Sequence, residues 1–67
     1  TMERNLRLDW HSLVEEAVKR RKEQKLSQKK LAVLAGVSGP TVNDFEQQRT
    51  TIRLESALKI LRCLGMA

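Results

Sequence analysis

Apolar side chains recur at helical spacing along most of this chain. The first such stripe lies within residues 9–24 and consists of Trp10, Leu13, Val14, Ala17 and Val18. These positions follow the spacing i, i+3, i+4, i+7 and i+8, which places them on one face of an α-helix that can be buried. Similar patterns predict further helices over residues 27–35, 38–47 and 53–64. The pattern therefore indicates an all-α domain with four helices around one core.

The two central helices are bounded by residues that start and stop helices. Ser27 and Ser38 can each accept a hydrogen bond from an unpaired backbone amide at a helix start. Gly36 can adopt the left-handed conformation that ends a helix, and Pro40 suits a first helical turn, where its missing N–H is not needed. Two short helices joined by a turn of about four residues form a helix-turn-helix, whose second helix can enter the DNA major groove.

The stretch LSQKKLAVLAGVSGPTVNDFE, residues 26–46, resembles the helix-turn-helix of Cro and phage repressors, also called the XRE family. The matching features are LSQ at the start of the first motif helix, LA within it, GVS in the turn and T-V-x-x-F-E in the second. The resemblance extends from about Val14 to Leu64. It implies a lambda-repressor-like DNA-binding domain, a bundle of four helices or of five.

The same resemblance implies an ion pair inside the domain. Arg21 continues the first apolar stripe, where an apolar residue would be expected. In this family, an arginine seven residues before the glutamine of LSQ typically pairs with the glutamate of the second motif helix. Here the three positions are Arg21, Gln28 and Glu46. We therefore expect a partly buried Arg21–Glu46 pair that ties the first helix to the third; the alternative is two unrelated surface charges.

DNA contacts of this fold divide into phosphate contacts, which position the protein, and base contacts, which specify the sequence. Phosphate contacts are expected from the start of the second helix, where free amides and the helix dipole attract anions, and from the loop after the third helix. Candidates are Ser27, Gln28, Lys29, Gln47, Arg49 and Thr51. Ordinary solvation or capping is the alternative for each of them.

Base contacts are expected from the exposed start of the third helix. The candidates there are Ser38, Gly39, Pro40, Thr41, Asn43 and Asp44. Gly39 and Pro40 depart from the family pattern, which often has base-contacting side chains at these positions. Asn43 is the best direct reader, because a carboxamide can pair with adenine N6 and N7. Asp44 would repel phosphate, and Thr41 has an internal helix cap as its alternative role.

The two ends of the chain carry weaker signals. Residues 1–8 are expected to be a flexible arm, although Leu6 and Leu8 alternate with polar residues; a DNA-contacting arm and a strand that pairs with a second subunit are the alternatives. The domain itself then covers residues 9–67. The last helix is expected to place five apolar side chains on its inner face: Leu54, Ala57, Leu58, Leu61 and Leu64.

Two features of the C-terminal half depart from the family pattern. Gln48 occupies a position where relatives usually have glycine or asparagine in a left-handed conformation, so we expect this loop to take another shape. Many relatives also have a fifth helix that builds the dimer interface, and this sequence stops at Ala67 without one. Either that helix belongs to a longer parent protein or, if this is the whole protein, we expect a dimer surface on the outer face of the last helix (Ile60, Cys63 and Met66) or on the N-terminal arm.

Composition supports a polyanionic partner. The chain has 67 residues and a net charge of +5, with 13 Lys and Arg against 8 Asp and Glu. Many of the cations cluster between Lys19 and Lys30, although a solvated helix end is an alternative explanation. One His and one Cys form no catalytic or metal constellation, and no apolar run approaches the roughly 20 residues of a membrane span. We expect no enzyme activity, no cofactor, no metal and no membrane association.

Two hypotheses follow from the sequence. The first is a DNA-binding regulator, a repressor that binds a two-fold symmetric operator as a homodimer in the cytoplasm, associated with the nucleoid. An autoregulating antitoxin with a cognate toxin partner and a phage-type regulator are both compatible subtypes. The alternative is a protein-interaction module that kept the fold without the DNA function; it is favoured by the Gly39-Pro40 pair and by Asp44.

Overall fold

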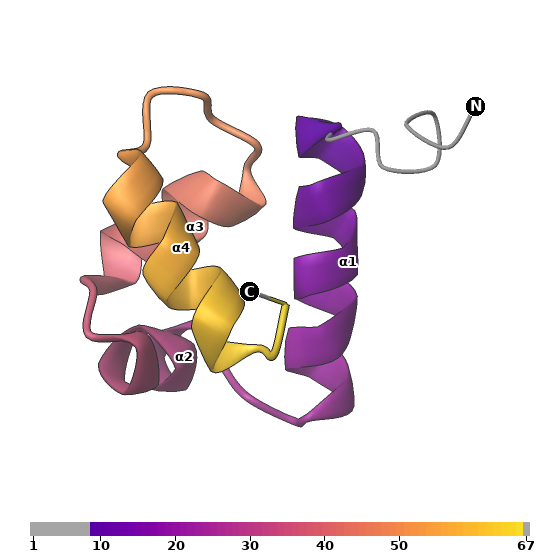
Figure 1. Ribbon diagram of the computed structural model, residues 1–67. Helices are drawn as coiled ribbons and strands as arrows, with labels where there is room; N and C mark the ends of the chain where they lie inside the picture. The colour runs from indigo at the N-terminus through magenta and orange to yellow at the C-terminus, as the bar shows by residue number, and fades with distance from the viewer. Residues whose placement is uncertain (1–8, 67) are drawn as a thin grey trace.

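The computed structural model describes residues 9–66, which form four α-helices and no strand. Helix α1 spans Trp10–Glu23, α2 spans Gln28–Ala35, α3 spans Gly39–Glu46 and α4 spans Leu54–Cys63 (Figure 1). Each bound lies within one residue of its prediction, and the all-α fold class is confirmed. The predicted arm, residues 1–8, and Ala67 lie outside the described residues.

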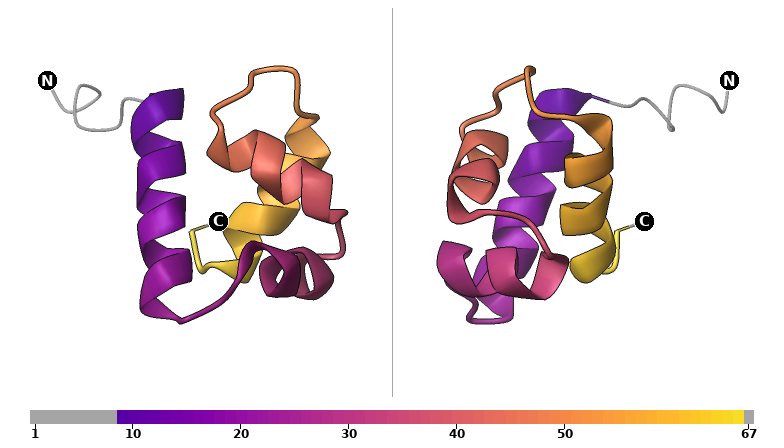
Figure 2. Two further views of the ribbon diagram at one scale, coloured as in Figure 1. Left: turned by 180° about the vertical axis from the view of Figure 1, so that it is seen from behind. Right: turned by 90° about the vertical axis from the view of Figure 1, so that its left-hand side faces the viewer.

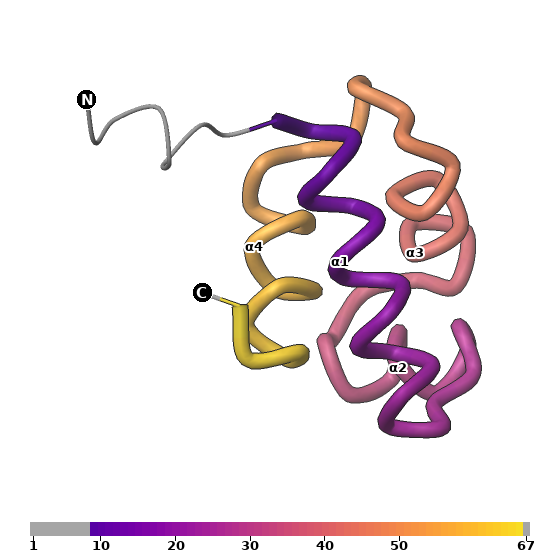
Figure 3. The backbone as a smooth tube through the Cα atoms, turned by 90° about the vertical axis from the view of Figure 1, so that its right-hand side faces the viewer, coloured from indigo at the N-terminus to yellow at the C-terminus, as the bar shows by residue number. Residues whose placement is uncertain are grey.

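The longest helix stands beside a group formed by the other three. Figure 1 shows α1 next to this group, and Figure 3 shows it crossing in front of the group, with α4 on one side and α2 and α3 on the other. The connection between α3 and α4, residues 47–53, lies at the same end of the molecule as the start of α1 (Figure 2). The helix-turn-helix pair, α2 and α3, is therefore held from one side by α1 and from another by α4.

Apolar residues from all four helices form one core. Its buried members are Val14, Ala17, Leu31, Ala32, Val42, Phe45, Ala57, Ile60, Leu61 and Leu64. Trp10 is half-buried against this core, and its ring meets the ring of Phe45 edge-to-face at a centroid distance of 5.5 Å. Such an aromatic pair adds stability beyond the area it buries. Trp10 thus anchors the start of α1 to the core.

The helix starts use the side-chain caps expected from the sequence. Ser27 Oγ accepts from the backbone amide of Lys30 at 2.9 Å, and Ser38 Oγ accepts from that of Thr41 at 3.2 Å. Asp9 accepts from the amide of His11 at the start of α1. Helix α4 differs, because Arg53 precedes it without a side-chain cap bond. Caps of this kind each contribute about 0.5–2 kcal/mol to helix stability.

All four helices end with a residue in the left-handed conformation: Lys25, Gly36, Gln48 and Gly65. In each case the amide of the following residue bonds back to a carbonyl of the last turn, as Arg49 N does to Asp44 O at 3.1 Å. Gln48 has a φ of 64°. The expectation that its loop takes another shape is therefore wrong. The back-bond and a side-chain contact with His11 at 2.7 Å hold it in place.

The buried face of α4 differs from the prediction. Ile60 is fully buried in the core, whereas Leu54 is 74% exposed and Leu58 is only half-buried. The buried stripe is Ala57, Ile60, Leu61 and Leu64, which also has helical spacing. Ile60 is in the core, so it does not lie on the outer face where the sequence analysis placed it; Cys63 and Met66 are partly buried against the core.

Candidate nucleic-acid interface

A network around one carboxylate fixes the helix-turn-helix against α1. Arg21 donates from Nε to Glu46 Oε2 at 2.6 Å and from Nη2 to Glu46 Oε1 at 3.2 Å. The two side chains are only 13% and 9% exposed. Arg21 also donates to the carbonyl oxygen of Leu26 at 2.7 Å. A bidentate, charge-assisted pair of this kind sets orientation as well as adding energy.

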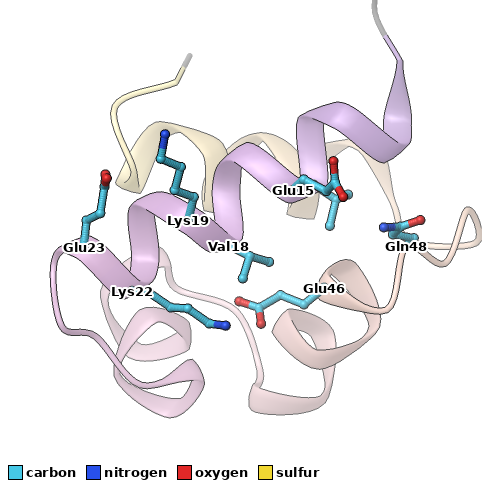
Figure 4. A pocket seen from close by; sticks show the side chains of 8 residues that line it. Glu15, Val18, Lys19, Lys22, Glu23, Glu46 and Gln48 are labelled. Carbon is cyan, nitrogen blue, oxygen red and sulfur yellow. The ribbon is translucent and has the colours of Figure 1, made fainter.

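Gln28 joins the same network from the start of α2. Its Nε2 donates to Glu46 Oε1 at 2.8 Å. Figure 4 shows Glu46 extending from the end of α3 into a groove along α1, beside Val18 and Lys22. The first residue of α2 and the last residue of α3 are thereby tied to one arginine of α1. The second amide hydrogen of Gln28 remains for an external acceptor.

Helix α3 presents a polar outer face. Val42 and Phe45 are fully buried on its inner side. Pro40, Asn43 and Gln47 are exposed, and their spacing places them on the opposite side of the helix. Within the described residues no side-chain hydrogen bond is formed by Asn43 or Gln47. Their amide groups are therefore available to an external partner.

At the start of α3, two capping side chains form a hydrogen bond with each other, and the surface beside Gly39 is open. The hydroxyl oxygens of Ser38 and Thr41 lie 2.7 Å apart in a hydrogen bond. Thr41 is half-buried, so its hydroxyl belongs to the cap rather than to a free surface. A Cβ added at Gly39 would meet no atom within 4 Å. Gly39 therefore provides open space at this end of the helix and no hydrogen-bonding side chain.

Arg49 of the loop after α3 pairs with a carboxylate of α3 itself. Arg49 Nε lies 3.4 Å from Asp44 Oδ1, with the two side chains 62% and 51% exposed. Exposed pairs like this contribute about 0–1 kcal/mol, so a phosphate can displace the carboxylate at little cost. Gln47 and Thr51 are exposed on either side of Arg49. At the other candidate phosphate site, Ser27 and Lys29 are exposed at the start of α2.

His11 is a link to this loop that sequence reasoning missed. Its Nδ1 lies 2.7 Å from Gln48 Oε1 and its Nε2 lies 3.1 Å from Glu15 Oε2. The hydrogen bond with Gln48, followed by the charge of Glu15, raises the pKa of His11 above its ordinary value of about 6.5. The two residues are 37 positions apart, so no local sequence signal could have paired them.

Other kinds of site have no support in the part of the chain that the structure describes. No three His, Cys, Asp or Glu side chains there are grouped so that they could hold a metal ion. None of the four helices has the length and apolar composition needed to cross a membrane.

Comparison with known proteins relates this chain to helix-turn-helix proteins. The family model described as "Helix-turn-helix" matches residues 19–67. An uncharacterized HTH-type transcriptional regulator of Haemophilus influenzae is 38% identical over 63 residues, which is 94% of this chain and 61% of the relative. The chain therefore spans about three-fifths of the length of the curated relative that it matches.

Proposed function

Because this chain belongs to the XRE-type helix-turn-helix family, we propose that it is a sequence-specific DNA-binding transcriptional regulator. In this proposal α3 enters the major groove, while the start of α2 and residues 47–53 contact the flanking phosphates. Residues 9–67 act as the DNA-binding domain. Double-stranded DNA is the partner, and the chemistry is binding rather than catalysis.

One observation carries the proposal: the outer face of α3 is polar and unobstructed, while the helix itself is rigidly held. The Arg21–Glu46–Gln28 network and the burial of Val42 and Phe45 fix its position. A recognition helix needs both properties, because base contacts are specific only when the backbone cannot adjust to a wrong sequence.

The proposed phosphate contacts lie on both sides of α3. At the start of α2, the backbone amides together with Ser27, Gln28 and Lys29 supply one site. Residues Gln47, Arg49 and Thr51 supply the other, with Arg49 exchanging its partner Asp44 for a phosphate. This arrangement requires a salt-dependent affinity, since each phosphate contact releases condensed counterions.

The proposed base contacts are few. Asn43 reads an adenine through its carboxamide, and Pro40 touches a thymine methyl. Gly39 allows the backbone to come close to the groove floor, since no atom occupies the space around it. Ser38 and Thr41 support these contacts by capping α3, and Asp44 holds Arg49 until a phosphate replaces it. DNA shape and half-site spacing supply the remaining specificity.

At the level of the assembly, we propose a repressor that binds a two-fold symmetric operator as a homodimer. Two α3 helices would then lie about 34 Å apart, one turn of DNA. The regulator works in the cytoplasm, associated with the nucleoid. Autoregulation, either as an antitoxin with a cognate toxin or as a phage-type regulator, fits the small basic domain.

The alternative is a protein-interaction module with the same fold. Two observations favour it: Gly39 and Pro40 offer no hydrogen-bonding side chain at the start of α3, and Asp44 pairs with Arg49, the main cation of the loop. In that case α3 would contact another protein, and DNA affinity would be weak and independent of sequence.

A fluorescence-anisotropy titration distinguishes the two functions. The probes are a labelled duplex from upstream of the protein's own gene and a shuffled duplex of the same composition, each at low and moderate salt. We expect tighter binding to the upstream duplex and a loss of ~10³-fold or more in affinity as salt rises. Equal binding to both duplexes would contradict autoregulation, and no binding to either would favour the interaction module.

A further inference from the structure

A groove lies between the last turn of α2 and the last turns of α4. It is lined by Leu34, Ala35, Lys59, Arg62 and Cys63. Ala35 and Cys63 are half-buried against the core, whereas the other three side chains are exposed. Figure 1 shows this part of α4 beside α2, at the opposite end of the molecule from the loop of residues 47–53. None of the lining residues belongs to the proposed DNA contacts.

Two adjacent apolar side chains of α2 lie outside the core. Leu31 and Ala32 are buried on the inner side of this helix, whereas Val33 is 68% exposed and Leu34 is 54% exposed. Leu34 forms one wall of the groove, and Val33 directly precedes it. Core packing does not account for either side chain. Exposed apolar surface that continues into a groove marks a place where another molecule binds.

The groove also has a cationic rim. Lys59 and Arg62 lie one turn apart on α4, and neither forms an ion pair with another described residue. Helix α2 has no acidic residue, and helical spacing places Lys30 one turn before Leu34 on the same face. The one acidic residue of α4, Glu55, lies in its first turn and does not line the groove. Apolar surface and uncompensated positive charge therefore meet at one place.

We propose that this groove binds an acidic amphipathic helix of a protein partner. Apolar side chains one turn apart on that helix cover Leu34, Ala35 and Cys63, and carboxylates beside them pair with Lys59 and Arg62. An amphipathic helix that lays its apolar face into a groove is a recurring mode of recognition. Complementary charge adds orientation and speeds association. The inference concerns a second surface of the domain and does not depend on DNA binding.

The charge of the groove argues against two other occupants. In a two-fold symmetric dimer through this patch, Lys59 and Arg62 of one copy would approach those of the other, and like charges repel. A DNA backbone would pair with the two cations but would leave Val33 and Leu34 against phosphates and water. An acidic amphipathic helix satisfies the apolar and the charged parts together.

Two synthetic peptides test the proposal on the full chain without DNA. Each has about 14 residues, roughly four helical turns, with leucines at i, i+3, i+4 and i+7. The first peptide has glutamates at the flanking positions, and the second has lysine in place of each glutamate. Both are titrated into the ¹⁵N-labelled protein, so that amide chemical shifts give the position of the binding site and its Kd.

Reversing the charge of the rim tests the ion pairs. The variant is Lys59→Glu with Arg62→Glu, and its matched control is Lys19→Glu with Lys22→Glu, which reverses two exposed cations at the same spacing on α1. We expect the rim variant to lose about tenfold in affinity for the glutamate peptide and to gain affinity for the lysine peptide. The control should match the parent protein, and circular dichroism should show the same helix content in both.

Leu34→Ser tests the apolar contact. It should weaken binding of the glutamate peptide by at least about tenfold, because a covered leucine loses its apolar partner. Leu54→Ser is the matched control, since Leu54 is an exposed leucine of α4 outside the groove. It should leave the Kd unchanged.

In the parent protein, the glutamate peptide should shift the amides of α2 and α4 around the groove. The proposal is wrong if these amides do not shift, if the two peptides bind equally, or if reversing the rim leaves the Kd unchanged. Shifts that appear with rising protein concentration alone would assign the groove to a second copy. Shifts caused by a DNA duplex but by neither peptide would assign it to DNA, and either result would overturn the proposal.

Discussion

At the scale of single residues, the unusual feature is that two residues other than glycine adopt the left-handed conformation. Two of the four, at the ends of α2 and α4, are glycines, whereas Lys25 and Gln48 adopt φ values of 58° and 64°. A side chain with a Cβ pays about 1–2 kcal/mol for this conformation. The same helix ending therefore occurs at two positions where the local sequence does not favour it.

Lys25→Gly should raise the free energy of unfolding by about 0.5–1 kcal/mol, because glycine adopts a positive φ without strain but loses more chain entropy on folding. Lys25 is exposed, so few contacts are lost. Urea denaturation followed by circular dichroism measures the change. Lys25→Ala is the matched control, since it removes the same charge and keeps a Cβ. Equal gains from both variants would attribute the effect to charge instead of backbone strain.

His11 should make stability depend on pH. Gln48 Oε1 and Glu15 Oε2 are both acceptors, so only the doubly protonated ring can donate to both. Its pKa is raised in the folded state. The stabilisation is therefore complete below the unfolded pKa of about 6.5 and is lost as pH rises through the higher folded pKa.

An NMR titration of the His11 ring should give a midpoint above about 6.5, and Glu15→Gln should lower it. Urea denaturation at several pH values should show the free energy of unfolding falling over the same range. His11→Ala should remove that part of the pH dependence. A midpoint at or below the ordinary value would show that the contacts with Gln48 and Glu15 are absent in solution.

At the scale of the elements, the Arg21–Glu46 pair is the main polar connection of α1 with α3. It is largely buried, and Gln28 adds a bond from α2. Removing one partner leaves the other charge without compensation. The helix-turn-helix geometry therefore depends on a residue outside the motif itself.

Arg21→Ala should lower the free energy of unfolding by about 3 kcal/mol, and the Arg21/Glu46 double-mutant cycle should give a coupling of ~1–3 kcal/mol. Urea denaturation of the four proteins measures it. The exposed Asp44–Arg49 pair is the matched control and should couple by less than about 1 kcal/mol. Additive effects at Arg21 and Glu46 would contradict the role assigned to the pair.

Helix α4 shows how packing selects between two apolar stripes. Leu54, Leu58 and Leu61 form one stripe, and Ala57, Ile60, Leu61 and Leu64 form another that overlaps it. Both have helical spacing, so periodicity alone cannot choose. The structure buries the second, with α4 packed against α2 and α3, and it leaves Leu54 exposed.

At the scale of the whole molecule, the proposed DNA-binding surface combines residues of different roles. Arg49→Ala should weaken binding to all sequences alike and reduce the salt slope by about one, because it removes one phosphate contact. Asn43→Ala should instead relax discrimination at one base pair by ~1–3 kcal/mol. Anisotropy titrations on specific and shuffled duplexes over a salt series separate these effects.

Arg62→Ala is the control for these titrations, since it removes an exposed cation near the end of α4 that has no place in the proposed interface. It should change neither the salt slope nor the sequence preference appreciably. If Asn43→Ala weakened specific and shuffled duplexes equally, Asn43 would not be a base reader.

The sequence by itself determined the helices, their caps and the family. Apolar periodicity, Ser27, Ser38, Gly36 and Pro40 act over a few residues, so they can be interpreted without knowing the fold. The family resemblance also pointed to Arg21 and Glu46 as an ion pair. That prediction came from their positions in the family motif and not from the local pattern of residues. The candidate DNA contacts rest on that same motif and are still predictions.

Only the tertiary structure decided which face of α4 is buried, that Lys25 and Gln48 adopt the left-handed conformation, and that His11 forms a hydrogen bond with Gln48. Each of these outcomes depends on groups far apart in the sequence, brought together by the packing of α1 and α4 around the motif. A stripe, a turn or a titratable side chain can be recognised locally. The residues that such a feature contacts are fixed only when the core has formed, because burial and hydrogen bonding depend on how the helices pack together.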